Sequence, residues 1–155
     1  MTKLQIWFSN YAERNYPVDI AFLIGSSRTT TQAHWRTTLD FVKSIADRFP
    51  VSEWGARMAL ISFDTSPRVE FSFRELTGPQ LNNYEVRRLI DRAKYKNGPT
   101  RIDRALKLAN TYLFTQAGGS RRNAMKVGTC SVYFGPFQRS VLEFQFRLTF
   151  ALKEH

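Results

Sequence analysis

Residues 18–24 read Val-Asp-Ile-Ala-Phe-Leu-Ile, an apolar run with one charged residue, Asp19. Continuous rather than alternating apolar character is typical of a β-strand that is buried on both faces. The run ends at Gly25, and a turn of hydroxyl side chains, interrupted only by Arg28, follows it. A strand with two buried faces needs helices on both sides of its sheet. This run therefore favours a layered α/β fold.

The next segments support that fold. Apolar residues recur at helical spacing from Trp35 to Phe49, and Pro50 ends the pattern. Residues 57–63 predict a second buried strand, whereas residues 68–73 alternate and predict a half-exposed strand near an edge. The short connection Asp-Thr-Ser-Pro predicts that these two strands form a hairpin.

Two more helices are predicted, one from Pro79 and one from about Arg101 to Phe114, before a strand that begins within 123–127. The order β-α-β-β-α-α-β implies a doubly wound, mostly parallel sheet with one antiparallel edge strand. In such folds the functional crevice lies beyond the carboxyl ends of the strands. We expect the turn after Gly25 to lie there, with the loop that holds Thr100 beside it.

Length and composition exclude several classes of protein. A chain of 155 residues suits one domain with a single core, and its one cysteine, Cys130, excludes an intrachain disulfide. No apolar run approaches the roughly 20 residues that span a bilayer. The first residues, MTKLQIWFSNYAERNYP, lack the apolar core and cleavage site of a signal peptide. We therefore expect no membrane span and identify no signal peptide.

The turn after Gly25 also lacks the marks of common catalytic motifs. A Walker loop needs a glycine-rich run ending in Lys-Ser or Lys-Thr, and a dinucleotide fingerprint needs three spaced glycines. A serine-hydrolase elbow needs flanking glycines and a distant histidine, but His34 lies in a predicted helix and His155 is the last residue. No nucleophile with a partner base can be assembled, so we predict that the protein is not an enzyme.

The chain is strongly basic, with a formal charge of +10 and a concentration of Lys and Arg between residues 87 and 107. Such a field favours anionic partners. The candidate polyanion-binding residues are Arg87, Arg88, Arg92, Lys94, Lys96 and Arg101. No interleaved aromatic residues or nucleic-acid motif accompany them, so a solvated helix face is the preferred interpretation and nucleic acid is not an expected partner. An acidic glycan remains the alternative.

Four segments together resemble a von Willebrand factor type A domain, of the kind found in collagen-associated and other matrix proteins: VDIAFLIGSSRTT, FVKSIADRF, RMALISFDTSPRVEFSF and NGPTRIDRALKLANTYLF. The resemblance runs from Pro17 to Val127. It implies a Rossmann-type α/β fold, an extracellular or matrix setting, and cell-adhesion or matrix-protein ligands. Members of the family often bind them through a metal-ion-dependent adhesion site. That site uses Asp-x-Ser-x-Ser after the first strand, a threonine before a later helix, and an aspartate after the fourth strand.

The resemblance implies a degenerate version of that site in this chain. Gly25 stands where the first aspartate belongs, Ser27 and Thr29 occupy the hydroxyl positions, and Thr100 matches the threonine. The last aspartate has no counterpart. Three neutral hydroxyls do not offset the cost of dehydrating Mg²⁺, so we expect weak or absent Mg²⁺ binding and no cofactor. Helix capping and turn formation explain the hydroxyls without a metal. The candidate ligand-binding residues are Ser26, Arg28 and Thr100.

The predicted domains are an extension at 1–16, a partial type A domain at 17–127, and a divergent tail at 128–155. The domain is expected to be incomplete at its C-terminal side. In the tail, apolar residues alternate with polar ones, which predicts one long strand: Leu142, Phe144, Phe146, Leu148, Phe150 and Leu152. That strand could replace a missing strand of the sheet, or expose an apolar stripe that promotes aggregation. A further hypothesis is that the tail is a gene-model artefact, read from an intron after Val127.

The leading functional hypothesis is a non-enzymatic module that binds a protein ligand through the loops at the carboxyl edge of its sheet, without a metal bridge. The alternative is a polyanion-binding module that uses residues 87–107. Binding of a polyanion should fall steeply with ionic strength, whereas a protein contact at the sheet edge should be less sensitive.

Overall fold

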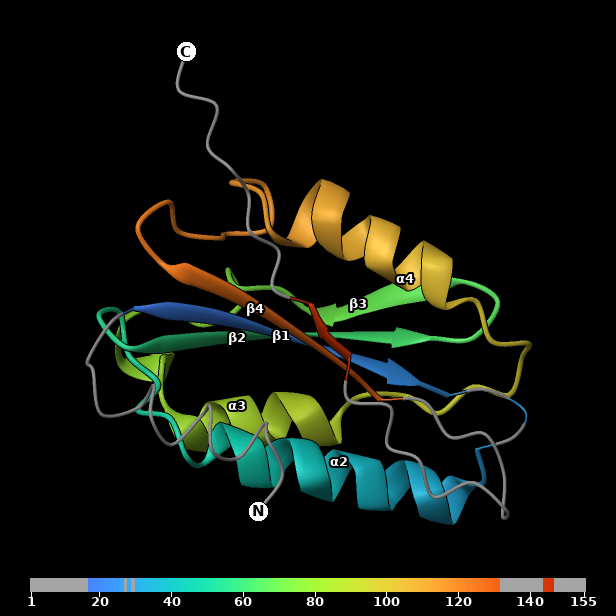
Figure 1. The fold of residues 1–155 in the computed structure, drawn as a ribbon. Coiled ribbons are helices and arrows are strands. Elements are labelled where there is room, and N and C mark those ends of the chain that lie inside the picture. Colours follow the sequence, from blue (N-terminus) through green and yellow to red (C-terminus); the bar gives the residue numbers. More distant parts are fainter. Residues whose placement is uncertain (1–16, 27, 29, 132–143, 147–155) are drawn as a thin grey trace.

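The structure, a computed structural model, describes residues 17–26, 28, 30–131 and 144–146 (Figure 1). In chain order its elements are β1 (Val18–Gly25), α2 (Gln32–Ala46), β2 (Ala56–Phe63), β3 (Pro67–Phe71), the 3₁₀ turn η1 (Gly78–Gln80), α3 (Asn83–Asp91), α4 (Ile102–Leu108), the π-helical turn η2 (Ala109–Leu113), β4 (Met125–Ser131) and β5 (Phe144–Phe146). The strands form one sheet in the order β3-β2-β1-β4-β5. The doubly wound α/β fold predicted from the sequence is confirmed.

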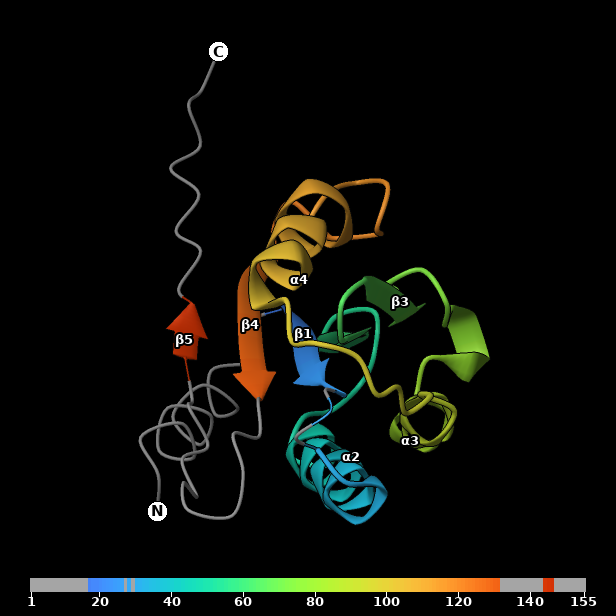
Figure 2. The ribbon, with the colours of Figure 1, turned by 90° about the vertical axis from the view of Figure 1, so that its right-hand side faces the viewer.

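The centre of the sheet is parallel and its described edges are antiparallel. β1 lies between β2 and β4 and pairs with both in parallel, along its whole length with β2. β3 is antiparallel to β2, as the hairpin prediction requires. β5 is a second antiparallel strand, beside β4 at the other edge (Figure 2).

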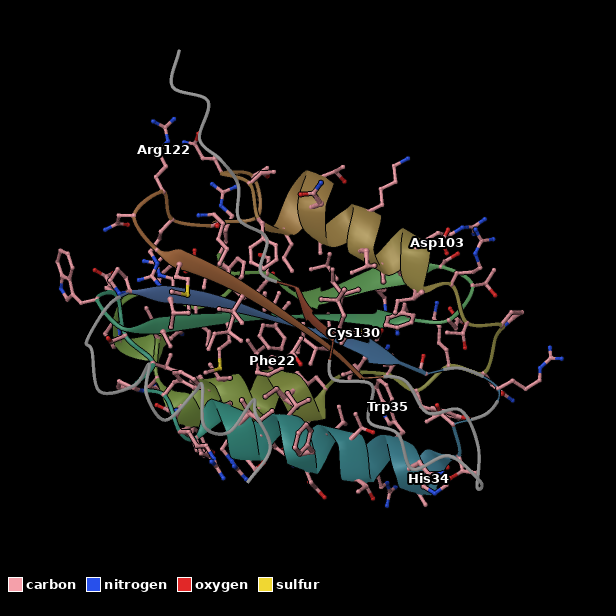
Figure 3. The ribbon with its side chains drawn as sticks, in the orientation of Figure 1. Phe22, His34, Trp35, Asp103, Arg122 and Cys130 are labelled. Atoms are coloured by element: carbon pink, nitrogen blue, oxygen red, sulfur yellow. The ribbon has the colours of Figure 1, made fainter. Side chains whose placement is uncertain are left out.

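Alternate residues of β1 supply two separate cores. Ile20 and Phe22 face α2 and α3, whereas Ala21 and Leu23 face α4. α2 and α3 cover one face of the sheet and α4 covers the other (Figure 1). The side chain of Phe22 lies on the side of α2 (Figure 3). An apolar run without alternation is the consequence, because neither face of this strand meets water.

Helix limits differ from the predicted ones in three places. α3 begins at Asn83 rather than Pro79, because Pro79 lies in η1 and Asn82 caps α3 by accepting the backbone N–H of Glu85 (3.0 Å). The helix expected to reach Phe114 changes from α-helical to π-helical after Leu108. α2 ends at Ala46, although Phe49 beyond it remains in the core.

The strand limits also bear on the predicted domain boundary. β4 continues to Ser131 and pairs with β1 across the position of Val127, so the first residues of the predicted tail belong to the sheet. The division of the chain at residues 16 and 127 otherwise remains a prediction.

Asp19, the charged residue of β1, is fully buried and tied to the loop that precedes β4. Its carboxylate accepts the backbone N–H of Arg121 (2.7 Å) and the Oγ–H of Ser120 (3.1 Å), and it forms an ion pair with the Arg121 guanidinium (2.8 Å). The same guanidinium donates to the carbonyl oxygens of Val18, Glu53 and Gly55. This network fixes the amino ends of the strands, opposite the predicted functional edge.

Candidate functional site

Three loops meet at the carboxyl edge of the sheet, and backbone hydrogen bonds join them. The N–H of Ser26 donates to the carbonyl of Phe63 at the end of β2 (2.8 Å). Farther along the same loop, the N–H of Arg28 donates to the carbonyl of Gly98 (2.9 Å). The loop before α4 is joined in turn to the loop after β2, because Arg101 N–H donates to the carbonyl of Asp64 (2.9 Å). The sequence prediction that the Thr100 loop approaches the turn after Gly25 is therefore confirmed.

The structure places four of the predicted site residues. Gly25 ends β1 and is buried, and Ser26 is buried beside it, with its hydroxyl 3.5 Å from the carbonyl oxygen of Phe63. Arg28 is exposed and forms no ion pair with a described residue. Thr100 is half-buried, but it does not cap α4, whose N-cap position is Arg101. Ser27 and Thr29 lie outside the described residues.

The donors that the described residues offer do not fit a magnesium site of the family type. In the three loops, Asp64 is the acidic residue, and its Oδ1 accepts the N–H of Ser66 (3.2 Å) within its own turn. Mg²⁺ is normally held by carboxylates together with water, so Ser26 and Thr100 alone cannot replace them. No group of three or more His, Cys, Asp or Glu residues that could hold a metal ion occurs among the residues that the structure describes.

A second acidic residue near this edge is neutralised locally. Asp103, in the first turn of α4 (Figure 3), forms two hydrogen bonds with the guanidinium of Arg101 (2.8 and 2.9 Å). Hydrogen bonding to Arg101 lowers the pKa of Asp103 to about 2, so this carboxylate is charged and paired at neutral pH. Arg104 in the same turn donates to the carbonyl of Thr65 (2.9 Å) and fastens α4 to the loop after β2.

Sequence reasoning missed the environment of Thr30. Its side chain is 1% exposed and its Oγ1 has no hydrogen-bond partner among the described residues, while its carbonyl accepts the hydroxyl of Tyr95. The neighbouring Thr31 caps α2 by accepting the N–H of His34 (3.2 Å). Nothing in a run of three threonines signals which one is buried.

The candidate polyanion-binding residues do not form one free cluster. Arg87 pairs with Asp47, Arg88 with Glu85 and Arg101 with Asp103. Arg101 precedes α4, whereas Arg87 and Arg88 lie on α3, which covers the opposite face of the sheet (Figures 1 and 2). Arg92, Lys94 and Lys96 lie in the connection between these two helices. Three form no ion pair with a described residue: Arg92, Lys94 and Lys96.

The fold and this edge define a class, that of doubly wound α/β domains with a loop site beyond the carboxyl ends of parallel strands. Comparison of sequences then gives the family. A family model for the von Willebrand factor type A domain matches residues 19–128, which is well over half of the chain. The chain belongs to this family, as the resemblance implied.

Individual relatives agree with that assignment. Matrilin-2 of Mus musculus is 28% identical over 118 residues, which are 76% of this chain and 12% of that protein. Cochlin of Homo sapiens is 35% identical over 83 residues, which are 54% of this chain and 14% of that protein. The chain thus corresponds to about an eighth of the length of these relatives.

A solved structure shows the same fold. Proximal thread matrix protein 1 from the mussel byssus, solved with a zinc-occupied adhesion-site motif, superposes with a TM-score of 0.70 at 18% identity. The match covers 82% of this chain and 34% of that chain. At this identity the likeness shows the fold alone.

Among the helices that the structure describes, none combines the length and apolar character needed to cross a membrane.

Proposed function

We propose that this domain is a non-enzymatic adhesion module that binds a protein ligand of the extracellular matrix through the loops at the carboxyl edge of its sheet, without a bridging metal ion. The single observation that carries the proposal is how the edge is held. Hydrogen bonds from Arg28 to Gly98 and from Arg101 to Asp64 join the three loops through their own backbones. Loops joined in this way are preorganised for binding, which lowers the entropy cost of association.

The residues at the edge support binding without a metal. Gly25 replaces the carboxylate that a metal bridge requires, and Asp64 is engaged within its own turn. Arg28 is exposed, and a guanidinium can bind carboxylates directly in a bidentate geometry. Arg28 and Thr100 are thus the proposed ligand contacts, while the buried Ser26 supports the loop from beneath.

A metal titration tests the first half of the proposal. Calorimetric titration of the protein with Mg²⁺, and separately with Mn²⁺, should show no saturable heat at concentrations below the millimolar range. This result is expected because neutral hydroxyls are poor substitutes for carboxylates. Saturable binding of either ion in that range would contradict the proposal that the site is degenerate.

A binding assay on immobilised extracellular-matrix proteins tests the second half. Arg28→Ala is expected to weaken binding, and EDTA is expected to leave binding of the natural sequence unchanged. Arg122→Ala is the matched control, because Arg122 is also exposed but lies at the opposite end of the molecule (Figure 3). Equal losses in the two variants, or loss of binding in EDTA, would refute binding through a metal-free carboxyl edge.

The alternative, binding of an acidic glycan, now concerns a smaller surface than residues 87–107. Arg92, Lys94 and Lys96 are at least partly exposed and close in sequence, whereas Arg87 and Arg88 are occupied by carboxylates. If the alternative holds, replacing the first three by Gln should lower the salt concentration that elutes the protein from immobilised heparin. The double variant Arg87→Gln and Arg88→Gln is the control, and should have the smaller effect.

A further inference from the structure

The loop before α4 contains the one Asn-Gly pair of the chain, Asn97 followed by Gly98. Asn97 is exposed and irregular in backbone, and its side-chain amide forms no hydrogen bond with a described residue. Gly98 has no Cβ, so its own side chain does not hinder the approach of its backbone nitrogen to the amide carbon of Asn97. An asparagine followed by glycine is therefore the setting in which a side-chain amide is most easily lost.

The packing of the carboxyl edge requires a glycine at position 98. A Cβ there would lie 2.6 Å from Oδ2 of Asp64 and 2.8 Å from Oγ1 of Thr65, closer than side chains tolerate. The carbonyl of Gly98 also accepts the N–H of Arg28 (2.9 Å), which joins this loop to the turn after β1. The exposed asparagine thus precedes the residue that protects it least, at a position that the edge does not allow to change.

We propose that Asn97 is a site of spontaneous deamidation, which places a new carboxylate at the carboxyl edge of the sheet. The deprotonated backbone nitrogen of Gly98 attacks Cγ of Asn97, the bond from Cγ to the amide nitrogen breaks, and that nitrogen takes up a proton and leaves as ammonia. Water then opens the cyclic imide at either of its two carbonyl carbons. One water is consumed for each ammonia released, and no electrons are exchanged with another molecule.

The two ways of opening the ring give two products with different consequences. Opening at one carbonyl gives an ordinary aspartate, which adds a negative charge near Asp64, the acidic residue of the three loops. Opening at the other gives an isoaspartyl residue, in which the main chain runs through the former side chain and is longer by one methylene group. That extra group lies directly before Gly98, so this product should also weaken the hydrogen bond from Arg28.

Peptide mapping of the full-length protein tests the reaction itself. The protein is kept at body temperature and mildly alkaline pH, and samples are digested and analysed by mass spectrometry. Asn123 is an internal control, because it is also exposed in a turn but is followed by Ala124, whose Cβ hinders the attack. Conversion of amide to acid should be about tenfold or more faster at Asn97 than at Asn123. Methylation by an isoaspartyl methyltransferase should detect the second product, and Asn97→Gln should abolish it.

Two results would overturn the proposal. One is conversion at equal rates at Asn97 and Asn123. The other is conversion of Asn97 that is more than about a hundredfold slower than in a synthetic peptide of residues 95–101, because the fold would then protect the pair.

Hydrogen exchange tests whether the modification reaches the carboxyl edge. In the isoaspartyl form, separated by ion exchange, the backbone N–H of Arg28 should exchange about tenfold or more faster than in Asn97→Gln. Asn97→Asp adds the charge without the methylene group and should have a smaller effect on this rate. An unchanged exchange rate in the isoaspartyl form would contradict the claim that the modification alters the edge.

The effect of the modification on ligand binding rests on the proposed function, whereas the reaction at Asn97 does not. If the ligand presents an acidic group to Arg28, Asn97→Asp should bind immobilised matrix proteins more weakly than Asn97→Gln, because like charges repel. Equal binding by the two variants, with deamidation of the natural sequence established, would count against an acidic ligand at this edge. Absence of deamidation would instead refute the modification site and leave the proposed function untouched.

Discussion

Replacing Asp19 by Asn should cost this domain a large part of its stability. Asp19 is fully buried, and the Arg121 side chain that faces it is only 12% exposed. The substitution keeps the size of the side chain but removes its charge. The guanidinium then stays beneath the surface without a carboxylate, held by the carbonyl oxygens of Val18, Glu53 and Gly55 and by one neutral amide oxygen at most.

The magnitude follows from the cost of an unpaired buried charge. Removal of one partner of a buried ion pair typically destabilises a protein by about 3–5 kcal/mol. The carboxylate of Asp19 also accepts hydrogen bonds from Ser120 and from the backbone of Arg121, and an amide can satisfy only part of these donors. Since domains of this kind are stable by about 5–15 kcal/mol, the expected loss is about a fifth of the total or more.

Urea denaturation followed by circular dichroism measures this loss. Asp103→Asn is the matched control, because Asp103 also pairs with an arginine, but on the surface, where a pair adds little. A double-mutant cycle with Arg121→Met separates the pairwise energy from the other contacts. A loss below about 1 kcal/mol for Asp19→Asn would refute the argument that this buried pair ties β1 to the loop before β4.

Three further outcomes are expected. Thr30→Val should raise the free energy of unfolding by about 1–2 kcal/mol, because it replaces an unsatisfied buried hydroxyl by a methyl group of similar size. If urea denaturation instead gives a lower free energy of unfolding for this variant, the hydroxyl has a partner. Burial raises the pKa of Cys130 to about 12, so above about pH 9 the thiol ionises in the unfolded chain before it does in the folded one. The difference in stability between the natural sequence and Cys130→Ala should therefore be constant below about pH 9 and shrink above it, by at most about 1.4 kcal/mol per pH unit. A stability difference that stays constant in thermal melts across this pH range would contradict the burial of the thiol. Phe22→Ala should lower the free energy of unfolding by about 3–5 kcal/mol and Trp54→Ala by about 0.5 kcal/mol or less, because these residues are 1% and 82% exposed. Losses of similar size for the two variants in urea denaturation would contradict this assignment of the core.

The parts of the fold that were predictable from sequence are those that local periodicity encodes. The runs that became β1 and β2 are mostly apolar, with no alternation, because helices cover both faces of the sheet. Helix limits were less predictable. Pro79 suits the first turn of an α-helix as well as that of a 3₁₀ turn, and only the cap that Asn82 makes places the start of α3.

In the candidate site, too, some features could be predicted from the sequence and others could not. The positions of Gly25 and Thr100 could be aligned to a family pattern because they depend on spacing along the chain. The partners that hold the edge together could not be predicted, since Arg28 and Gly98 are far apart in sequence and meet through backbone atoms that any residue carries. The bond between Asp19 and Arg121, whose ends are 102 positions apart in the sequence, could not be predicted for the same reason.

If the proposed function holds, the charges at the carboxyl edge explain why the loss of one aspartate would change the chemistry of the whole site. A metal bridge needs a negative pocket, because the carboxylates must offset the dehydration of the cation. In this chain Gly25 removes one negative charge, Arg101 neutralises Asp103, and Arg28 has no described carboxylate beside it. An edge with this balance repels a cation and attracts an anion. Under the proposed function, the same loops that would present a metal in a charged version of the site would instead contact an acidic group of the ligand directly.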